Sequence, residues 1–105
     1  MEQIKGKRAL VTGASSGIGA AFARVLGEWG AELVIAARRK VRMEQLAAEI
    51  RGAGGVKVSV IEADLSRPGA AEALWREATA AGSIDILINN AGFGLYERFT
   101  DTPWP

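Results

Sequence analysis

The chain has 105 residues, enough for a single domain, and its formal net charge is +1. This near-neutral balance, without a run of Lys and Arg, gives no electrostatic reason to expect nucleic acid or an anionic membrane as a partner. Cysteine and histidine are both absent, which excludes a disulfide framework, thiolate chemistry and the commonest general base and metal ligand. No stretch approaches the ~20 apolar residues of a membrane span, so we expect a soluble, cytoplasmic protein.

Apolar runs alternate with helix-like periodicities along the chain. Apolar runs predict strands at residues 8–12, 32–37, 56–62 and 84–90. The first run is typical of a strand that is covered on both faces, and the second of a buried strand. A β-α-β-α-β-α-β order predicts a parallel sheet with right-handed crossovers. If the first three strands progress one way and the chain then reverses, the strand order is 3-2-1-4. We therefore predict a Rossmann-like α/β fold with the first two helices on one face of the sheet and the third helix on the other.

The three segments between the strands have the apolar period of helices. We expect the first helix to start at Gly17 and to end at Gly30, and the second to end in the glycines of 52–55. Ser66 and Pro68 are predicted to cap and open the third. The predicted core-facing residues are Ile18, Phe22, Val25, Leu26 and Trp29 in the first helix, Met43, Leu46, Ala47 and Ile50 in the second, and Ala71, Leu74 and Ala78 in the third.

The stretch TGASSGIG joins the first strand to the first helix. In such a turn the backbone N–H groups and the positive end of the helix dipole bind a phosphate. Gly13 would permit the sharp turn, Gly17 the close approach of the phosphate, and Gly19 tight packing of the helix. Ser15 and Ser16 add uncharged hydroxyl donors. The alternative is a small α/β domain in which these glycines only make turns.

Three motifs in this sequence resemble those of the short-chain dehydrogenase/reductase family. They are TGASSGIG at 12–19, DL at 64–65 and NNAG at 89–92, in the family's order and spacing. The resemblance covers essentially the whole chain, and it implies a nicotinamide dinucleotide as cofactor.

The resemblance also implies roles for particular residues. It implies that the pyrophosphate contacts Gly13, Ser15, Ser16, Gly17, Ile18 and Gly19. The adenine would contact Asp64 and the Leu65 backbone, and the adenosine ribose would contact the Asn90 backbone. Ala91 and Gly92 complete the cofactor-binding set. Asn89 is expected to tie neighbouring strands together instead. The alternative role for Asp64 is a helix-capping carboxylate.

The end of the second strand distinguishes the two nicotinamide cofactors. An NAD enzyme usually places an acid there for the ribose 2′-OH, whereas this chain has Ala36 and Ala37 followed by Arg38. A guanidinium can hold a 2′-phosphate with two hydrogen bonds. We therefore predict that the cofactor is NADP(H) and that Arg38 selects it. The next basic residues, Arg39, Lys40 and Arg42, are interpreted as a solvated helix start.

Catalytic groups are missing from the sequence. The resemblance implies a catalytic Ser and a Y-x-x-x-K motif, but the only tyrosine, Tyr96, is followed four residues on by Thr100. We assign no catalytic or metal-binding residue, and we expect residues 1–105 to be the N-terminal part of an NADP-binding Rossmann domain without its catalytic half.

Three functions stay open. The chain is the cofactor-binding half of an NADP(H)-dependent oxidoreductase, or a nucleotide-binding or self-assembling module without redox turnover. The third possibility is a new hydrolytic activity at Ser15 or Ser16, although nothing in the sequence fixes a base beside either serine.

Without further helices, the third helix alone would leave part of its sheet face uncovered. We expect Leu10, Val34 and Val58 on that face, and the strand at 84–90 as an open edge. Exposed apolar surface of this kind recruits another chain. The sequence therefore predicts a homo-oligomer, most simply a twofold dimer through the uncovered face or the edge, with Leu74, Trp75 or the Phe93–Trp104 tail contributing.

Overall fold

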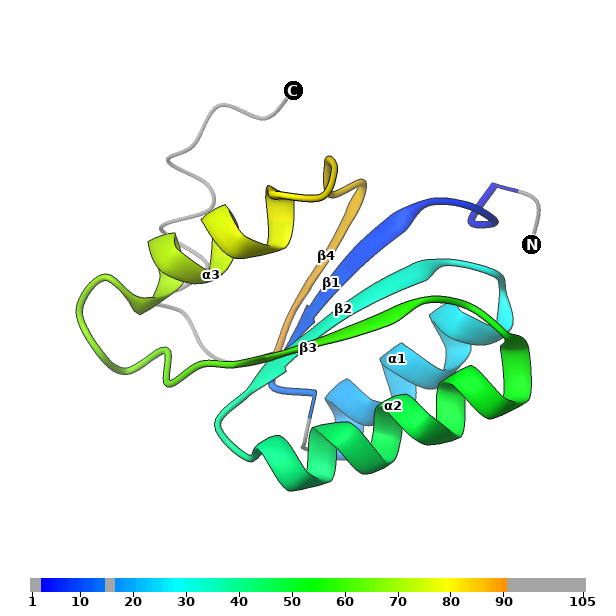
Figure 1. The fold of residues 1–105 in the computed structure, drawn as a ribbon, viewed down its shortest axis with the longest axis horizontal. Coiled ribbons are helices and arrows are strands. Elements are labelled where there is room, and N and C mark those ends of the chain that lie inside the picture. The colour runs from blue at the N-terminus through cyan, green and yellow to red at the C-terminus, as the bar shows by residue number, and fades with distance from the viewer. Residues whose placement is uncertain (1–2, 15–16, 91–105) are drawn as a thin grey trace.

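The computed structural model describes residues 3–14 and 17–90. Its four strands are all parallel and lie in the order β3-β2-β1-β4, which confirms the predicted topology (Figure 1). The predicted bounds of the first two strands are correct, and the last two strands are shorter than predicted. The elements are β1 (Arg8–Thr12), α1 (Gly17–Glu28), β2 (Glu32–Ala37), α2 (Lys40–Gly54), β3 (Val58–Glu62), α3 (Ala70–Thr79) and β4 (Ile86–Asn89).

Helices α1 and α2 cover one face of the sheet and α3 covers the other, as predicted (Figure 1). The assignment of side chains to these faces needs one correction. Leu10 and Val34 lie on the α3 face, but they are already buried there, with 0% and 1% of their surface exposed. Val58 is aligned with Leu33, and both pack in the α1–α2 layer. The prediction that Val58 shares a face with Leu10 was wrong because side chains alternate along each strand, and alignment across the strands sets the face.

The predicted core face of α1 was also wrong. Its buried residues are Gly19, Ala23, Leu26 and Gly27, whereas the exposed fractions of Ile18, Phe22, Val25 and Trp29 are 65%, 46%, 38% and 38%. Only Leu26 of the predicted set is buried. The physical reason is close approach, since a Cβ added at Gly27 would lie 2.6 Å from Cγ2 of Ile50 on α2. Small residues face the sheet and α2 here, and the larger apolar side chains are left outside.

The other helices follow the sequence more closely. All four predicted core residues of α2 are buried, as are Leu74 and Ala78 of α3. Gly30 ends α1 with a positive φ of 92°, and the Ala31 N–H donates to the Leu26 carbonyl over 3.0 Å, a Schellman arrangement. The start of α3 was predicted too early, because the helix begins only at Ala70.

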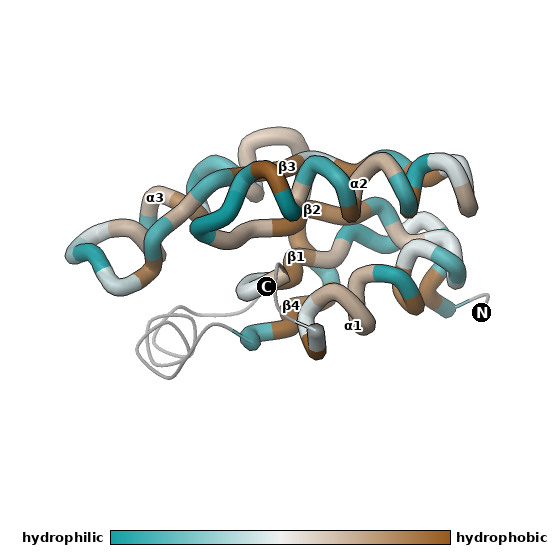
Figure 2. The backbone as a smooth tube through the Cα atoms, turned by 90° about the horizontal axis from the view of Figure 1, so that it is seen from below, coloured by the Kyte–Doolittle hydropathy of each residue, from teal (hydrophilic) through white to brown (hydrophobic). Residues whose placement is uncertain are grey.

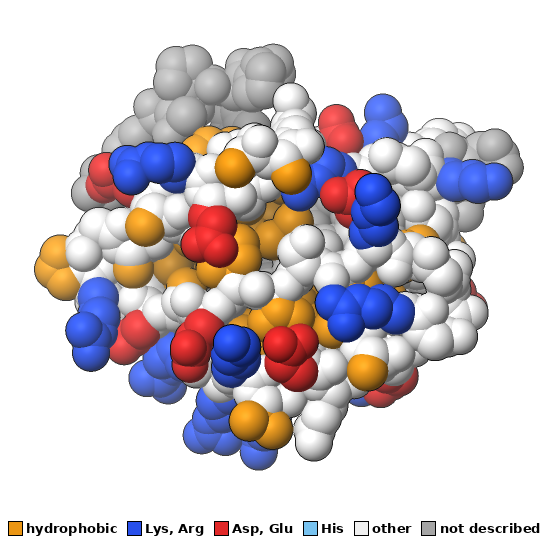
Figure 3. Space-filling view, in the orientation of Figure 1, with side chains coloured by type: hydrophobic (Ala, Val, Ile, Leu, Met, Phe, Trp, Pro, Cys, Tyr) orange, Lys and Arg blue, Asp and Glu red, His pale blue; other side chains and the backbone are white. Residues whose placement is uncertain are grey.

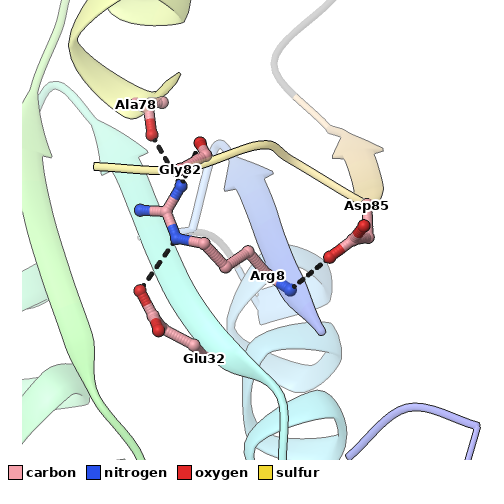
Figure 4. A network of polar contacts seen from close by, with 5 residues as sticks. All are labelled: Arg8, Glu32, Ala78, Gly82 and Asp85. Atoms are coloured by element: carbon pink, nitrogen blue, oxygen red, sulfur yellow. Dashed lines mark hydrogen bonds and ion pairs between the residues drawn. The ribbon is translucent and has the colours of Figure 1, made fainter. Parts of the chain in front are cut away.

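A half-buried arginine, Arg8, joins four elements at the amino ends of the strands (Figure 4). The Arg8 guanidinium donates to Glu32 Oε2 over 2.8 Å, to the Ala78 carbonyl over 2.9 Å and to the Gly82 carbonyl over 2.7 Å. Its backbone N–H donates to Asp85 Oδ2 over 2.9 Å. The network therefore fixes the end of α3 and the start of β4 against β1 and β2. The sequence analysis did not identify it.

The surface has no single electrostatic character. Figure 3 shows acidic and basic side chains interspersed around apolar ones that lie in a hollow of the face between the helical layers. In Figure 2 the strands form an apolar middle, and polar residues recur along the helices on either side. Within the described residues, no helix is long and apolar enough to cross a membrane.

Candidate functional site

The site predicted from the sequence lies where the direction of the chain reverses across the sheet. From β1 the chain moves to β2 and β3 on one side, and β4 returns to the other side of β1. A reversal of this kind opens a crevice outside the carboxyl ends of the strands. Gly13, Arg38 and Asn90 directly follow β1, β2 and β4, and Asp64 comes two residues after β3. Residues from four distant parts of the sequence therefore lie together at the carboxyl ends of the strands.

The turn after β1 is tightly held by its neighbours. Gly13 has a φ of +66°, and a Cβ there would lie 3.1 Å from the backbone carbonyl of Asn90. The Ala14 N–H donates to the Ala36 carbonyl over 3.3 Å, which ties the turn to β2. A Cβ at Gly19 would lie only 2.3 Å from the Gly13 oxygen, so α1 begins directly over the turn. The conformational reasons given for Gly13 and Gly19 thus agree with the structure.

The start of α1 is open on its outer side. Among the described residues, no atom would lie within 4 Å of a Cβ added at Gly17, and Ile18 is 65% exposed. The first turn of α1 contains no acidic residue, so no carboxylate of its own neutralises the positive end of the helix dipole. An anion could therefore approach the backbone at Gly17 without steric conflict. Four other predicted site residues, Ser15, Ser16, Ala91 and Gly92, lie outside the described residues.

A buried hydroxyl connects the turn to β4. Thr12 is fully buried, and its Oγ1 lies 3.2 Å from Asn89 Oδ1 and 3.4 Å from the Ile88 carbonyl, while it accepts a hydrogen bond from the Asn90 N–H over 3.0 Å. The Asn90 side-chain amide donates to the Gly13 carbonyl over 3.3 Å. Asn89 therefore ties the strands together, as predicted. Sequence reasoning missed Thr12, although a hydroxyl that ends an apolar run just before a glycine was a usable signal.

At the end of β2, two small buried side chains are followed by exposed basic ones. Ala36 and Ala37 are buried, and Arg38 is exposed immediately after them. Arg39 stands at the N-cap of α2 without a side-chain cap, and the first turn of α2 has no acidic residue. Arg39, Lys40 and Arg42 are exposed at this helix start, which agrees with their interpretation as solvated. No carboxylate at this position would repel a phosphate.

The carboxylate after β3 is held in a turn. Asp64 Oδ1 accepts from the Ser66 hydroxyl over 2.6 Å and from its N–H over 3.1 Å, and Arg67 Nε lies 3.6 Å from Oδ2. These hydrogen bonds, together with the charges of Arg38 and Arg67, lower the pKa of Asp64. Because α3 is capped at Gly69, Asp64 is a turn residue and not a helix cap.

The influence of Arg38 on Asp64 shows that the ends of β2 and β3 share one electrostatic environment. Leu65, next to Asp64, packs its side chain against the α3 layer, which leaves its backbone as the part that could contact a ligand. The carboxyl ends of the strands thus present the backbone N–H donors at the start of α1 and the Arg38 guanidinium after β2. Among the described residues, no group of three or more His, Cys, Asp or Glu side chains could hold a metal ion.

Comparisons with known proteins agree with this fold. The family model for the short chain dehydrogenases matches residues 7–104. Nodulation protein G of Rhizobium sp. (strain N33) is 43% identical, over 99% of this chain and 42% of its own length. A bulky-bulky ketone specific alcohol dehydrogenase from Comamonas testosteroni is 45% identical with a TM-score of 0.76, and the match covers 82% of this chain and 34% of that one.

A short-chain dehydrogenase from Sphingobium yanoikuyae, solved in complex with NADPH, is similar to the same extent. It is 46% identical with a TM-score of 0.76, over 82% of this chain and 34% of its own. This chain therefore spans well under half the length of each of these three relatives.

Proposed function

The chain belongs to the short-chain dehydrogenase family, and we propose that it binds NADP(H) at the carboxyl ends of its strands as the cofactor-binding part of an oxidoreductase. The observation that carries the choice of NADP(H) is the exposed Arg38 guanidinium directly after the buried Ala36 and Ala37, with no acid at this position. The Sphingobium yanoikuyae relative, which is described as a complex with NADPH, supports the same cofactor.

The described geometry suits a dinucleotide in two places. The open space at Gly17 and the dipole of α1 suit the pyrophosphate. The guanidinium of Arg38 suits a 2′-phosphate. The predicted contacts are the pyrophosphate with Gly13, Ser15, Ser16, Gly17, Ile18 and Gly19, the 2′-phosphate with Arg38, the adenine with Asp64 and the Leu65 backbone, and the ribose with the Asn90 backbone, with Ala91 and Gly92 completing the set. Bound NADPH would supply a hydride, and the role of these residues would be to bind and orient the dinucleotide.

The strength of the cofactor preference can be bounded. A hydrogen bond to a charged group contributes about 1.5–3 kcal/mol, and about 1.4 kcal/mol is a tenfold change in affinity. One guanidinium–phosphate hydrogen bond therefore gives a preference of roughly ten- to a hundredfold for NADPH over NADH. NADH offers Arg38 only a neutral hydroxyl, and the end of β2 has Ala36 and Ala37 in place of a carboxylate that would hold that hydroxyl in compensation.

We further propose that this 105-residue chain binds the cofactor without turning it over. Its only tyrosine, Tyr96, lacks a lysine four residues later. A general acid for carbonyl reduction must lie within hydrogen-bond reach of the reacting oxygen and have a suitable pKa. The 105 residues contain no Y-x-x-x-K motif to supply that tyrosine and lysine, so residues 1–105 would act as a cofactor-binding unit.

Titration with NADPH and NADH, read by tryptophan fluorescence, tests the binding proposal. We expect NADPH to bind about ten- to a hundredfold more tightly than NADH, and Arg38→Ala to remove most of that difference. Arg42→Ala is the matched control, since it deletes an exposed arginine from the start of α2 and should preserve the preference. Equal affinities in the unmodified protein would overturn the role of Arg38. Steady NADPH oxidation with a carbonyl substrate would overturn the absence of turnover.

A further inference from the structure

The two carboxylate oxygens of Asp64 have different surroundings. Oδ1 accepts two hydrogen bonds from one residue, from the Ser66 hydroxyl over 2.6 Å and from the Ser66 backbone N–H over 3.1 Å. Oδ2 accepts no hydrogen bond from the described part of the chain. Nε of Arg67 lies 3.6 Å from it, but the Arg67 side chain is 80% exposed. Oδ2 is therefore the oxygen of Asp64 that is left for a ligand.

Asp64 lies beside Arg38 because the backbone joins the ends of their strands. The Ala63 N–H donates to the Ala37 carbonyl over 2.9 Å, and β2 and β3 end on the same side of the sheet (Figure 1). The pKa of Asp64 is lowered first by the Ser66 hydrogen bonds and also by the positive charge of Arg38. In an adenosine 2′-phosphate the base and the phosphate are attached to neighbouring ribose carbons. If Arg38 holds the phosphate, Asp64 is therefore within reach of the base.

We propose that Ser66 is a positioning residue, which holds Oδ1 of Asp64 and thereby presents Oδ2 to the exocyclic amino group of adenine. The inference rests on the proposed dinucleotide binding and adds the residue that orients the base-selecting group. An ionised carboxylate only accepts hydrogen bonds, and the exocyclic amino group of adenine is a donor. A purine with an exocyclic oxygen, such as hypoxanthine, presents an acceptor that the carboxylate repels. The site therefore favours adenine over such a base.

The path of the chain after β3 does not depend on the Ser66 hydroxyl. The Arg67 N–H donates to the Asp64 carbonyl over 3.1 Å, and the Ala70 N–H donates to the Arg67 carbonyl over 3.2 Å. The N-cap of α3 is Gly69, and no side chain caps this helix. Backbone hydrogen bonds thus define the turn, and the hydroxyl contributes to the orientation of the carboxylate.

Titration with NADPH and with its hypoxanthine analogue, read by tryptophan fluorescence, tests the base selection. The two ligands share the 2′-phosphate and the pyrophosphate and differ only in the base. A hydrogen bond to a charged group corresponds to roughly ten- to a hundredfold in affinity. Because the Asp64 side chain is 34% exposed, water competes with the base. We therefore expect the lower end of this range, about tenfold in favour of NADPH.

Substitutions at position 66 test the positioning role. We expect Ser66→Ala to lower the affinity for NADPH by about two- to tenfold, the equivalent of one lost neutral hydrogen bond, and to leave the affinity for the analogue unchanged. Ser66→Thr keeps the hydroxyl and should retain the preference. Ser59→Ala is the matched control, because it deletes the hydroxyl of an exposed serine on β3 and should change neither affinity. Circular dichroism confirms that each variant is folded.

Asp64→Asn gives a second, independent test. Both Ser66 groups donate to Oδ1, so an asparagine at position 64 is held with its oxygen toward Ser66 and its amide nitrogen in the place of Oδ2. The nitrogen is a donor, which suits the exocyclic oxygen of hypoxanthine and not the amino group of adenine. We expect this variant to reverse the preference, so that the analogue binds about two- to tenfold more tightly than NADPH.

The outcomes separate this inference from the proposed function. If the unmodified protein prefers NADPH to NADH but binds the hypoxanthine analogue as tightly as NADPH, the role of Ser66 is overturned and the proposed function stands. A Ser66→Ala protein that loses the same affinity for both ligands would show a purely structural role and would also overturn the inference, as would an Asp64→Asn protein that still prefers NADPH. If the unmodified protein does not bind NADPH at all, both proposals are wrong.

Discussion

Two glycines in the first turn of α1 lead to opposite predictions. At Gly19 an added Cβ would lie 2.3 Å from the Gly13 oxygen, and ordinary contact begins at 3.4 Å. The helix or the turn must therefore shift by about 1.1 Å, the difference between these distances. Overpacking lowers the free energy of unfolding by about 1–3 kcal/mol, whereas replacing a glycine within a helix by alanine raises it by up to about 1 kcal/mol. Because the clash is with backbone atoms, which cannot move aside cheaply, we take the upper overpacking cost less the helical gain and expect Gly19→Ala to lower the free energy of unfolding by about 2 kcal/mol. The displaced turn should also weaken NADPH binding.

At Gly17 the same change meets no atom of the residues that the structure describes within 4 Å of the added Cβ. We expect Gly17→Ala to leave the free energy of unfolding unchanged or to raise it by up to about 1 kcal/mol. The new methyl group occupies the space through which the pyrophosphate would approach. The affinity for NADPH should therefore fall by about tenfold or more, the equivalent of a steric cost above about 1.4 kcal/mol.

Urea unfolding followed by circular dichroism, together with NADPH titration, separates the two effects. Gly19→Ala should lower the free energy of unfolding, whereas Gly17→Ala should lower only the affinity for NADPH. A Gly19→Ala protein as stable as the unmodified one would show that the turn and helix relax freely. If Gly17→Ala bound NADPH with unchanged affinity, the ligand would not approach the backbone at that position.

Three further predictions concern the polar contacts. Thr12→Val should lower the free energy of unfolding by about 1–3 kcal/mol, because the Asn90 N–H loses its acceptor; an unchanged urea midpoint would contradict this. Arg8→Met removes three side-chain hydrogen bonds and should lower the free energy of unfolding by at least about 1.5–3 kcal/mol, the contribution of one hydrogen bond to a charged group. Amide exchange should become faster at the end of α3 and the start of β4 than in α2. The pKa of Asp64 is lowered in the folded chain, so its contribution to stability is present above the ordinary carboxyl pKa of 3.8 and is lost as the pH falls below it. In the Ser66→Ala protein the melting temperature should fall less steeply than in the unmodified protein as the pH is lowered through this range. Parallel curves of melting temperature against pH for the two proteins would refute the prediction.

The sequence predicted the sheet and its topology well, because the patterns involved are local. Strands β1 and β2 are buried on both faces and have continuous apolar runs, which set their limits clearly. The apolar stripe of α2 identified its core face correctly. The positions of Gly13 and Gly19 at a strand–helix turn also indicated their conformational roles correctly.

The errors arose where packing between elements overrides the local pattern. In α1 the largest apolar residues suggested the core face, but close approach of Gly27 to Ile50 reserves that face for small residues. Ser66 followed by Pro68 resembled a helix start, yet the Ser66 hydroxyl bonds Asp64 in the preceding turn. The Arg8 network joins residues up to 77 positions apart, and no single-sequence pattern reports such a contact.

The central claim is that a 2′-phosphorylated dinucleotide binds at the carboxyl ends of the strands. Amide chemical shifts of the isotope-labelled protein, recorded during an NADPH titration, test this most directly. We predict saturable shifts at Gly13, Gly17, Gly19, Arg38 and Asn90, with the Arg38 shift much smaller when NADH replaces NADPH. The amides around Arg8, at the opposite ends of the strands, should not move. Shifts confined to the Arg8 end, or no saturable shifts at the carboxyl ends, would contradict the proposed site.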